Sequence, residues 1–231
     1  MVKGYVSQIC RSKRYPKAVL FYLMRKGILL NMLNVSESTI KDVSMEIDDI
    51  LKLFKDRLPD FRPTSGLLNR MDLYLITRVT KPECVLETGV ERGWASAIIL
   101  AALEKNRKGT LFSIDLPLPM GILEEKMVGE VVPSELRHRW KLYLGRSDDL
   151  MLDILKKEIK KLDIFIHDSC HSYETMMWEY LTAWRFIKDN GFILSHDTVA
   201  SDAFFDIARQ LKCPYTWTPH GEYGVIKKVK I

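Results

Sequence analysis

Short apolar runs alternate with segments of helical periodicity from residue 84 to the C-terminus. The apolar runs have the length and composition of buried strands and lie at 84–86, 110–114, 141–144, 164–166 and 192–195. The helical segments lie at 94–106, 150–160, 173–188 and 203–211, and residues 215–218 and 224–229 predict a closing hairpin. Buried strands that alternate with helices predict a parallel sheet covered on both faces, which binds ligands at the carboxyl ends of its strands.

The segment before residue 84 follows a different pattern, because its apolar residues recur only at helical spacing. One helix, capped by Ser36 or Ser38, is predicted to run to about residue 54. A second amphipathic helix begins near residue 67 and ends at Pro82. We therefore divide the chain into a basic arm and helical extension over residues 1–64 and an α/β domain over residues 65–231.

Composition narrows the class of protein. The 231 residues are 47% hydrophobic and 28% charged, as in ordinary globular domains. Apolar runs reach only about seven residues, whereas a membrane-spanning helix needs roughly 20. The four cysteines are scattered without a C-x-x-C pair, which favours reduced thiols in a cytoplasmic protein over a zinc site or a disulfide scaffold.

The net charge of +5 is unevenly distributed. Seven of the 35 basic residues lie within residues 1–30, which contain no acid, so that the remainder has 28 basic and 30 acidic residues. The basic arm has three interpretations: a solvated face, peripheral contact with an anionic membrane surface, or contact with another subunit of a homo-oligomer or with an anionic substrate. A nearly neutral body argues against nucleic acid as the main partner.

Polar residues gather at the ends of the predicted strands. Gly89 and Gly93 stand between the first strand and a helix, where glycines let a ligand approach the backbone. Asp115 ends the second strand, 22 residues beyond Gly93, and a carboxylate there can accept hydrogen bonds from both ribose hydroxyls. Glu87 and Glu91 disfavour a pyrophosphate. This pattern favours a nucleoside cofactor that carries a cationic sulfonium and an amino group.

Several motifs carry a resemblance to a known family. Glu87-Thr88-Gly89 with Gly93-Trp94-Ala95-Ser96 is similar to the first motif of class I S-adenosylmethionine-dependent methyltransferases, and Ser113-Ile114-Asp115 is similar to their second. Residues 166–174 resemble the D-x-x-H-x-Y-E stretch of the subgroup that contains macrocin O-methyltransferase and the cephalosporin hydroxylase-like proteins. Residues 190–197 match the fifth strand of that subgroup, and the resemblance covers about residues 65–231.

The resemblance implies a fold and a set of site residues. The fold is α/β, with a Rossmann-like seven-stranded sheet that is mostly parallel and has a C-terminal antiparallel strand. The cofactor-binding residues that it implies are Glu87, Gly89, Gly93, Asp115, Ser147 and Asp148. His171 matches a general base, and Asp168 and Asp197 match ligands of a divalent cation such as Mg²⁺. The neighbours of Asp197 are His196 and Thr198 rather than a second acid, so His196 becomes the third candidate metal ligand.

Each of these residues also has a structural interpretation. Asp168 and Asp197 can cap the helices that follow them, and His167 can pack inside its strand. The base assignment for His171 depends on its spacing from Asp168. The long segment 116–138 is expected to form a lid or an acceptor pocket.

The function expected from the resemblance is S-adenosylmethionine-dependent O-methylation of a small-molecule hydroxyl, on a sugar or a secondary metabolite. Three alternatives remain. A nucleic-acid methyltransferase lacks support because no N-P-P-[YF] stretch follows the fourth strand. A nicotinamide-dependent oxidoreductase would need a third glycine in the first loop. The third is a non-catalytic protein that keeps the fold, as an interaction protein or a cofactor-binding protein; an interaction protein would not need the intact set Gly89, Gly93 and Asp115.

Overall fold

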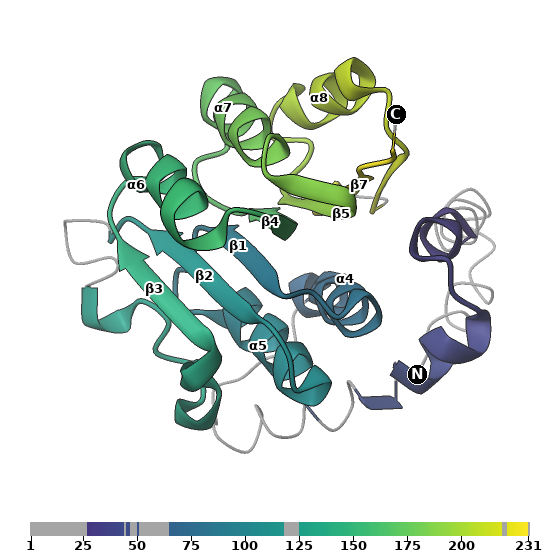
Figure 1. The fold of residues 1–231 in the computed structure, drawn as a ribbon, viewed down its shortest axis with the longest axis horizontal. Coiled ribbons are helices and arrows are strands. Elements are labelled where there is room, and N and C mark those ends of the chain that lie inside the picture. The colour runs from purple at the N-terminus through teal and green to yellow at the C-terminus, as the bar shows by residue number, and fades with distance from the viewer. Residues whose placement is uncertain are drawn as a thin grey trace.

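The computed structural model describes residues 27–43, 45–46, 50, 65–117, 125–218 and 221–230. At its centre is a seven-stranded sheet with the strand order β3-β2-β1-β4-β5-β7-β6 (Figure 1). The strands are β1 (Cys84–Thr88), β2 (Thr110–Asp115), β3 (Trp140–Leu144), β4 (Leu162–His167), β5 (Ile187–His196), β6 (Tyr215–Trp217) and β7 (Tyr223–Lys227). Strands β1 to β5 are parallel, and β7 is antiparallel to both β5 and β6. The expected α/β sheet with a C-terminal antiparallel strand is therefore confirmed.

Helices cover both faces of this sheet (Figure 1). They are α4 (Ser65–Thr80), α5 (Trp94–Asn106), α6 (Ser147–Ile154), α7 (Tyr173–Trp184) and α8 (Ala203–Leu211), with a π-helical turn at Leu155–Ile159 and 3-10 turns at Glu125–Met127 and Ser134–Arg139. Alternate strand residues enter separate cores: Val85 packs with residues of α4 and α5, whereas Leu86 packs with residues of α6, α7 and α8. The period of two along a strand thus builds two cores, one on each face.

The described part of the N-terminal extension packs against the α4 side of the sheet. It is helical over 27–33 and 37–43, and Ser36 Oγ accepts a hydrogen bond from the Thr39 backbone N–H at 3.3 Å. Ser36 is therefore the helix cap. Lys227 Nζ on β7 donates to the Met32 carbonyl at 2.7 Å. The basic residues 1–26 lie outside the described residues, and the division at residue 64 stays a prediction.

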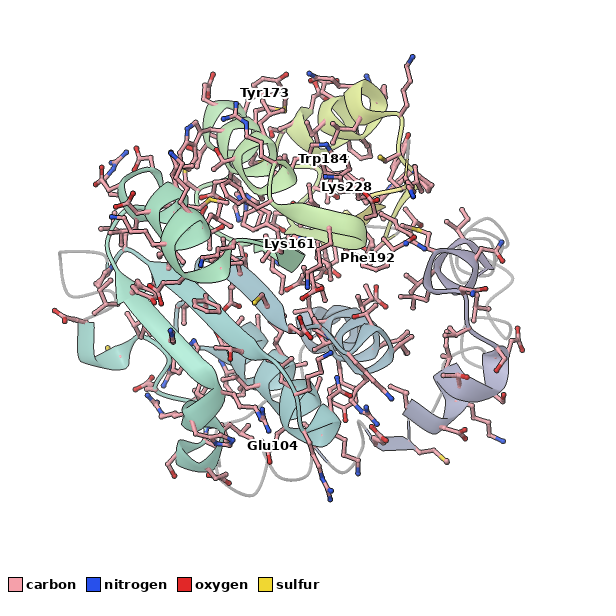
Figure 2. The ribbon with its side chains drawn as sticks, in the orientation of Figure 1. Glu104, Lys161, Tyr173, Trp184, Phe192 and Lys228 are labelled. Atoms are coloured by element: carbon pink, nitrogen blue, oxygen red, sulfur yellow. The ribbon has the colours of Figure 1, made fainter. Side chains whose placement is uncertain are left out.

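Helix α7 ends at Trp184 rather than at residue 188 as the sequence pattern predicts. Lys228 explains the early end, because its Nζ donates to the carbonyls of Trp184 at 3.1 Å and Ile187 at 2.8 Å. The same ammonium lies 4.8 Å from the Trp184 ring centroid, and Figure 2 shows both side chains. A cation at this position satisfies carbonyls that a helix C-terminus leaves without partners.

Strand β5 begins at Ile187, so the predicted turn at Asn190-Gly191 lies within the strand. Pairing with β4 starts at Leu162↔Ile187 and resumes with a register shift at Ile164↔Phe192. Asn190 has a positive φ of 65°, as expected for an irregularity inside a strand. The predicted lid at 116–138 is described only outside 118–124. None of the described helices has the length and apolar character to span a membrane.

Candidate active site

Strands β1, β4 and β5 are neighbours in the sheet, so their carboxyl ends present adjacent loops. Thr88 pairs with His167, and His167 pairs with Ser195. The residues that directly follow these three are Gly89, Asp168 and His196. Sequence positions up to 107 residues apart therefore meet at one edge, which is where ligands bind in sheets of this kind.

The loop between β1 and α5 requires glycine at two positions. Gly89 has a φ of 83°, and a Cβ there would lie 2.0 Å from the Asp168 carbonyl oxygen. Gly93 has a φ of 93°, and a Cβ there would lie 2.7 Å from Gly129 Cα. The Gly89 N–H donates to the Ile114 carbonyl at 2.9 Å. Both glycines thus allow close backbone contacts on either side of the loop.

Asp115 joins this loop from the end of β2. Its Oδ2 accepts a hydrogen bond from the Glu91 N–H at 3.1 Å. Burial raises the pKa of Asp115, and hydrogen bonds from the N–H groups of Val90 and Glu91 oppose that rise. The carboxylate therefore orders the glycine loop, and its role at a ribose stays a prediction.

Glu87 is a fully buried carboxyl group beneath the same loop. Its Oε2 accepts hydrogen bonds from Ser96 Oγ at 2.6 Å and Ser113 Oγ at 2.8 Å. Its Oε1 has no hydrogen-bond partner among the described residues. Burial raises the pKa of Glu87 to about 8, although both serines act in the opposite direction. An orphaned buried oxygen of this kind suits a cationic ligand group.

Ser147 and Asp148 open helix α6. Asp148 is paired with Arg146 through Nη2–Oδ2 and Nε–Oδ1 contacts of 2.6 and 2.8 Å. This hydrogen bonding lowers the pKa of Asp148. The structure thus gives Asp148 a protein partner, and its role beside an adenine ring stays a prediction.

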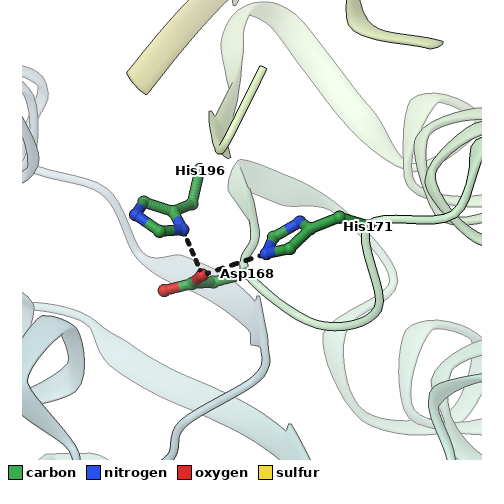
Figure 3. A group of neighbouring side chains, drawn as sticks. All are labelled: Asp168, His171 and His196. Carbon is green, nitrogen blue, oxygen red and sulfur yellow. Dashed lines mark ion pairs between the residues drawn. The ribbon is translucent and has the colours of Figure 1, made fainter. Parts of the chain in front are cut away.

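A cluster of acids and histidines lies beside the glycine loop, and Figure 3 shows three of its members, Asp168, His171 and His196. Asp168 Oδ1 lies 2.8 Å from His196 Nδ1 and 4.0 Å from His171 Nε2. Asp197 Oδ2 lies 3.5 Å from His196 Nδ1 and 3.6 Å from His171 Nε2. The four residues singled out at the ends of the fourth and fifth strands therefore share one site.

The cluster has the composition of a candidate cation site. Asp168, His171 and His196 each offer one ligand atom, and these atoms lie within 4.8 Å of one another. The sequence analysis names Asp197 as a metal ligand together with Asp168 and His196. In the group of the structure, His171 takes the place of Asp197. Burial and the neighbouring His167 lower the pKa of His171, whereas Asp168 and Asp197 act to raise it. The His171 ring is therefore neutral around pH 7, as a base or a metal ligand must be.

Sequence reasoning missed a buried partner of this cluster. Glu179 on α7 is completely buried, and its Oε2 lies 2.7 Å from His167 Nδ1. A signal for it was present in the sequence, because Glu179 interrupts the apolar stripe of Met176, Tyr180 and Ala183 on α7. An acid on such a stripe needs buried partners.

Comparison with known proteins agrees with this geometry. Residues 86–198 match the family model described as a methyltransferase domain. That range contains the glycine loop, Asp115 and the whole acid–histidine cluster. No curated protein sequence matches the chain.

Solved structures share the fold of this chain at low sequence identity. An O-methyltransferase from Bacillus cereus in complex with S-adenosylhomocysteine (SAH) is 15% identical with a TM-score of 0.56, over 87% of this chain and 95% of that one. SAH-bound PaMTH1 from Podospora anserina is 14% identical with a TM-score of 0.56, over 85% and 97%. The O-methyltransferase TomG from Streptomyces achromogenes, involved in tomaymycin synthesis and in complex with S-adenosylmethionine (SAM), is 14% identical with a TM-score of 0.58, over 84% and 91%.

Proposed function

We propose that the protein is a SAM-dependent methyltransferase that transfers a methyl group to a hydroxyl of a small molecule, such as a sugar or a secondary metabolite. The observation that carries the proposal is the direct contact between the glycine loop and the acid–histidine cluster. A Cβ on Gly89 would lie only 2.0 Å from the carbonyl oxygen of Asp168. A cofactor on the loop and an acceptor on the cluster would therefore be neighbours.

The residues of the glycine loop fit the chemistry of SAM. The orphaned Oε1 of Glu87 suits the ammonium of its methionine part, and the Asp115 carboxylate at the end of β2 would accept hydrogen bonds from ribose hydroxyls. Solved structures with the same fold were determined with SAH or SAM. When bound, SAM supplies a methyl group that is already activated on a sulfonium sulfur. The protein then has to align the acceptor and remove its proton.

The acid–histidine cluster fits the second task. A neutral His171 can take the proton of an acceptor hydroxyl at Nε2. The carboxylates of Asp168 and Asp197 lie 4.0 and 3.6 Å from that nitrogen and would stabilise the imidazolium that forms. His196 closes the cluster on the side of β5.

A divalent cation is a second way in which this cluster would activate a hydroxyl. Asp168, His171 and His196 would hold it, and it would supply positive charge next to the acceptor oxygen. One carboxylate with two imidazoles suits Mn²⁺ or another transition metal better than Mg²⁺. His171 cannot be a base at Nε2 and a metal ligand at that atom at the same time, so dependence on metal separates the two roles.

Cofactor binding is the first test. Calorimetry with SAM, SAH and NAD should give binding of the two sulfur nucleosides and none of NAD. Asp115→Ala should weaken SAH binding, because the carboxylate both orders the loop and contacts the ligand. Failure of both sulfur nucleosides to bind would remove the proposed function.

Methyl transfer is the second test. Labelled SAM is incubated with a panel of phenols, catechols and sugars, with and without EDTA, and with Mg²⁺ or Mn²⁺ restored. His171→Ala should leave SAH binding intact and lower turnover by about 10²–10⁴-fold. His138→Ala is the matched control, since His138 is exposed and pairs with Glu104 at 3.2 Å. Turnover that EDTA leaves unchanged would exclude the cation and retain His171 as base.

A further inference from the structure

A buried carboxylate–imidazole pair lies directly beneath the acid–histidine cluster. Glu179 on α7 and His167 at the end of β4 have no exposed side-chain surface, and Glu179 Oε2 lies 2.7 Å from His167 Nδ1. Thr88 Oγ1 donates to the same carboxylate oxygen at 2.6 Å, and Ser169 Oγ donates to Oε1 at 2.8 Å. Both oxygens of Glu179 therefore have hydrogen-bond donors, which come from β1, from β4 and from Ser169 in the loop after β4.

These contacts fix the chemical state of the pair. Burial acts to raise the pKa of Glu179, but the hydrogen bond and charge of His167, with the hydroxyls of Ser147 and Thr88, bring it below its ordinary value. An ionised carboxylate only accepts hydrogen bonds, so His167 holds a proton on Nδ1, which faces Glu179 Oε2 at 2.7 Å. The Nε2 of His167 is buried and has no hydrogen-bond partner among the described residues. On a ring that holds a single proton, at Nδ1, this second nitrogen carries the lone pair and can accept a hydrogen bond.

The neighbouring imidazole is that of His171. The two ring centroids are 5.3 Å apart, and the ring planes meet at 78°. His171 directs Nε2 to Asp168 and Asp197, while its Nδ1 is buried and has no hydrogen-bond partner within the described ranges. Two adjacent imidazoles thus each have one orphaned buried nitrogen. Buried nitrogens of this kind normally have a partner, either direct or through an ordered water.

We propose that Glu179 and His167 are positioning residues for His171. His167 Nε2 accepts a hydrogen bond from one buried water to which His171 Nδ1–H donates, and so keeps the lone pair of His171 on Nε2, facing the acceptor. The inference rests on the proposed role of His171 at the methyl acceptor. The same tautomer is required whether that nitrogen takes a proton or binds a cation, because a histidine is oriented by the hydrogen bond of its other nitrogen.

Nitrogen-15 NMR of the full chain, labelled at its five histidines, tests the tautomer without any substrate. In the wild type His171 should be protonated at Nδ1. His167→Asn keeps a donor for Glu179 and deletes the Nε2 acceptor, so His171 should shift towards the Nε2–H form. His167→Gln places an amide oxygen near the lost nitrogen and should restore the Nδ1–H form. An Nε2–H tautomer in the wild type overturns the proposal whether or not either variant folds.

A matched control separates positioning from general damage to the core. Tyr180→Phe removes the buried hydrogen bond to Ser195, 2.6 Å long, from a ring that packs 5.5 Å from His167. The His171 tautomer should be unchanged in this variant. An unchanged His171 tautomer in a folded His167→Asn protein would show that His167 is only part of the core.

Kinetics distinguish failure of this inference from failure of the proposed function. With an acceptor from the panel, His167→Asn should lower kcat by about 10–100-fold with little change in KM, and His167→Gln should recover part of the loss. SAH affinity should stay at the wild-type value in both variants. Loss of SAH binding by the wild type would remove the proposed function and leave the tautomer result standing, whereas a wild-type kcat in His167→Asn would overturn the positioning role alone.

Discussion

Two fully buried carboxyl groups lie on opposite faces of β1, and their environments differ sharply. Glu87 belongs to β1 itself and faces Ser96 on α5. The next residue, Thr88, faces the other way and donates to Glu179 on α7. Burial raises the pKa of Glu87 to about 8, whereas the pKa of Glu179 is below its ordinary value despite equal burial.

The difference lies in the donors. Glu87 receives two serine hydroxyls on one oxygen, and the other oxygen has no partner in the described structure. Glu179 receives hydroxyls on both oxygens and an imidazole N–H in addition. Two hydroxyl donors do not offset the hydration that an ionised Glu87 would lose on burial. The hydroxyl donors and the imidazole together do offset it for an ionised Glu179. We infer that Glu179 has its permanent partner within the fold and that Glu87 is built to receive one from the ligand.

We expect the largest loss of stability when Glu179, whose hydrogen-bond donors all lie within the fold, is replaced by a neutral side chain. Glu179→Gln keeps the volume but replaces an oxygen that accepts from buried donors with an NH₂ group. We expect the free energy of unfolding to fall by about 3 kcal/mol, as when one partner of a buried pair is lost. Urea denaturation at pH 7 measures it. Glu174→Gln, at the start of the same helix, is the control and should change stability little. A loss below the error of the measurement would mean that Glu179 is not held as an ion.

We expect a gain in stability at high pH, rather than a loss, when Glu87 on the other face of β1 is replaced by a neutral side chain. In the folded protein Glu87 keeps its proton up to a pKa of about 8, whereas in the unfolded chain it loses the proton near the ordinary glutamate pKa of 4.5. The folded state thus binds more protons between these values, so this group makes stability fall as pH rises through that window. Glu87→Gln removes the dependence and should be more stable than wild type by about 1–3 kcal/mol at pH 9, with little difference at pH 4. Equal slopes for the two proteins from pH 4 to 9 would contradict a protonated Glu87.

SAH binding tests whether the ligand supplies the partner that Glu87 lacks. If the ammonium of SAH pairs with Glu87, binding at pH 7 should release nearly one proton, because a group with a pKa of about 8 is mostly protonated there. Calorimetry in buffers of different ionisation enthalpy counts that proton. Glu87→Gln should release none and should bind SAH about 10-fold more weakly, since a charge-assisted hydrogen bond is lost. Tight binding without proton release in the wild type would place the ammonium elsewhere.

How much of this was predictable from the sequence depends on the range of the interactions. The bounds of α5 and α8 follow from local periodicity and agree with prediction. The end of α7 does not, because Lys228 binds it from 44 residues away. The site shows the same division. The residues at the strand ends were found from motifs. Glu179 on α7 was missed because its donors Thr88 and His167 belong to strands β1 and β4, which only the fold brings next to it.

The smallest effects are expected when one hydroxyl donor is removed on each face of β1. Ser96→Ala removes a donor that stabilises the ionised form of Glu87 more than the protonated form, so its cost should grow from pH 6 to pH 9 by about 1 kcal/mol. Thr88→Val removes a donor of similar length to Glu179, which is ionised at both pH values because its pKa is lowered. Its cost of about 1 kcal/mol should therefore be the same at pH 6 and pH 9. Urea denaturation at the two pH values measures both variants side by side. A pH-independent cost for Ser96→Ala, or a pH-dependent one for Thr88→Val, would show that the two carboxyl groups are not held in different charge states. The contrast between a ligand-dependent Glu87 and a self-sufficient Glu179 would then have to be abandoned.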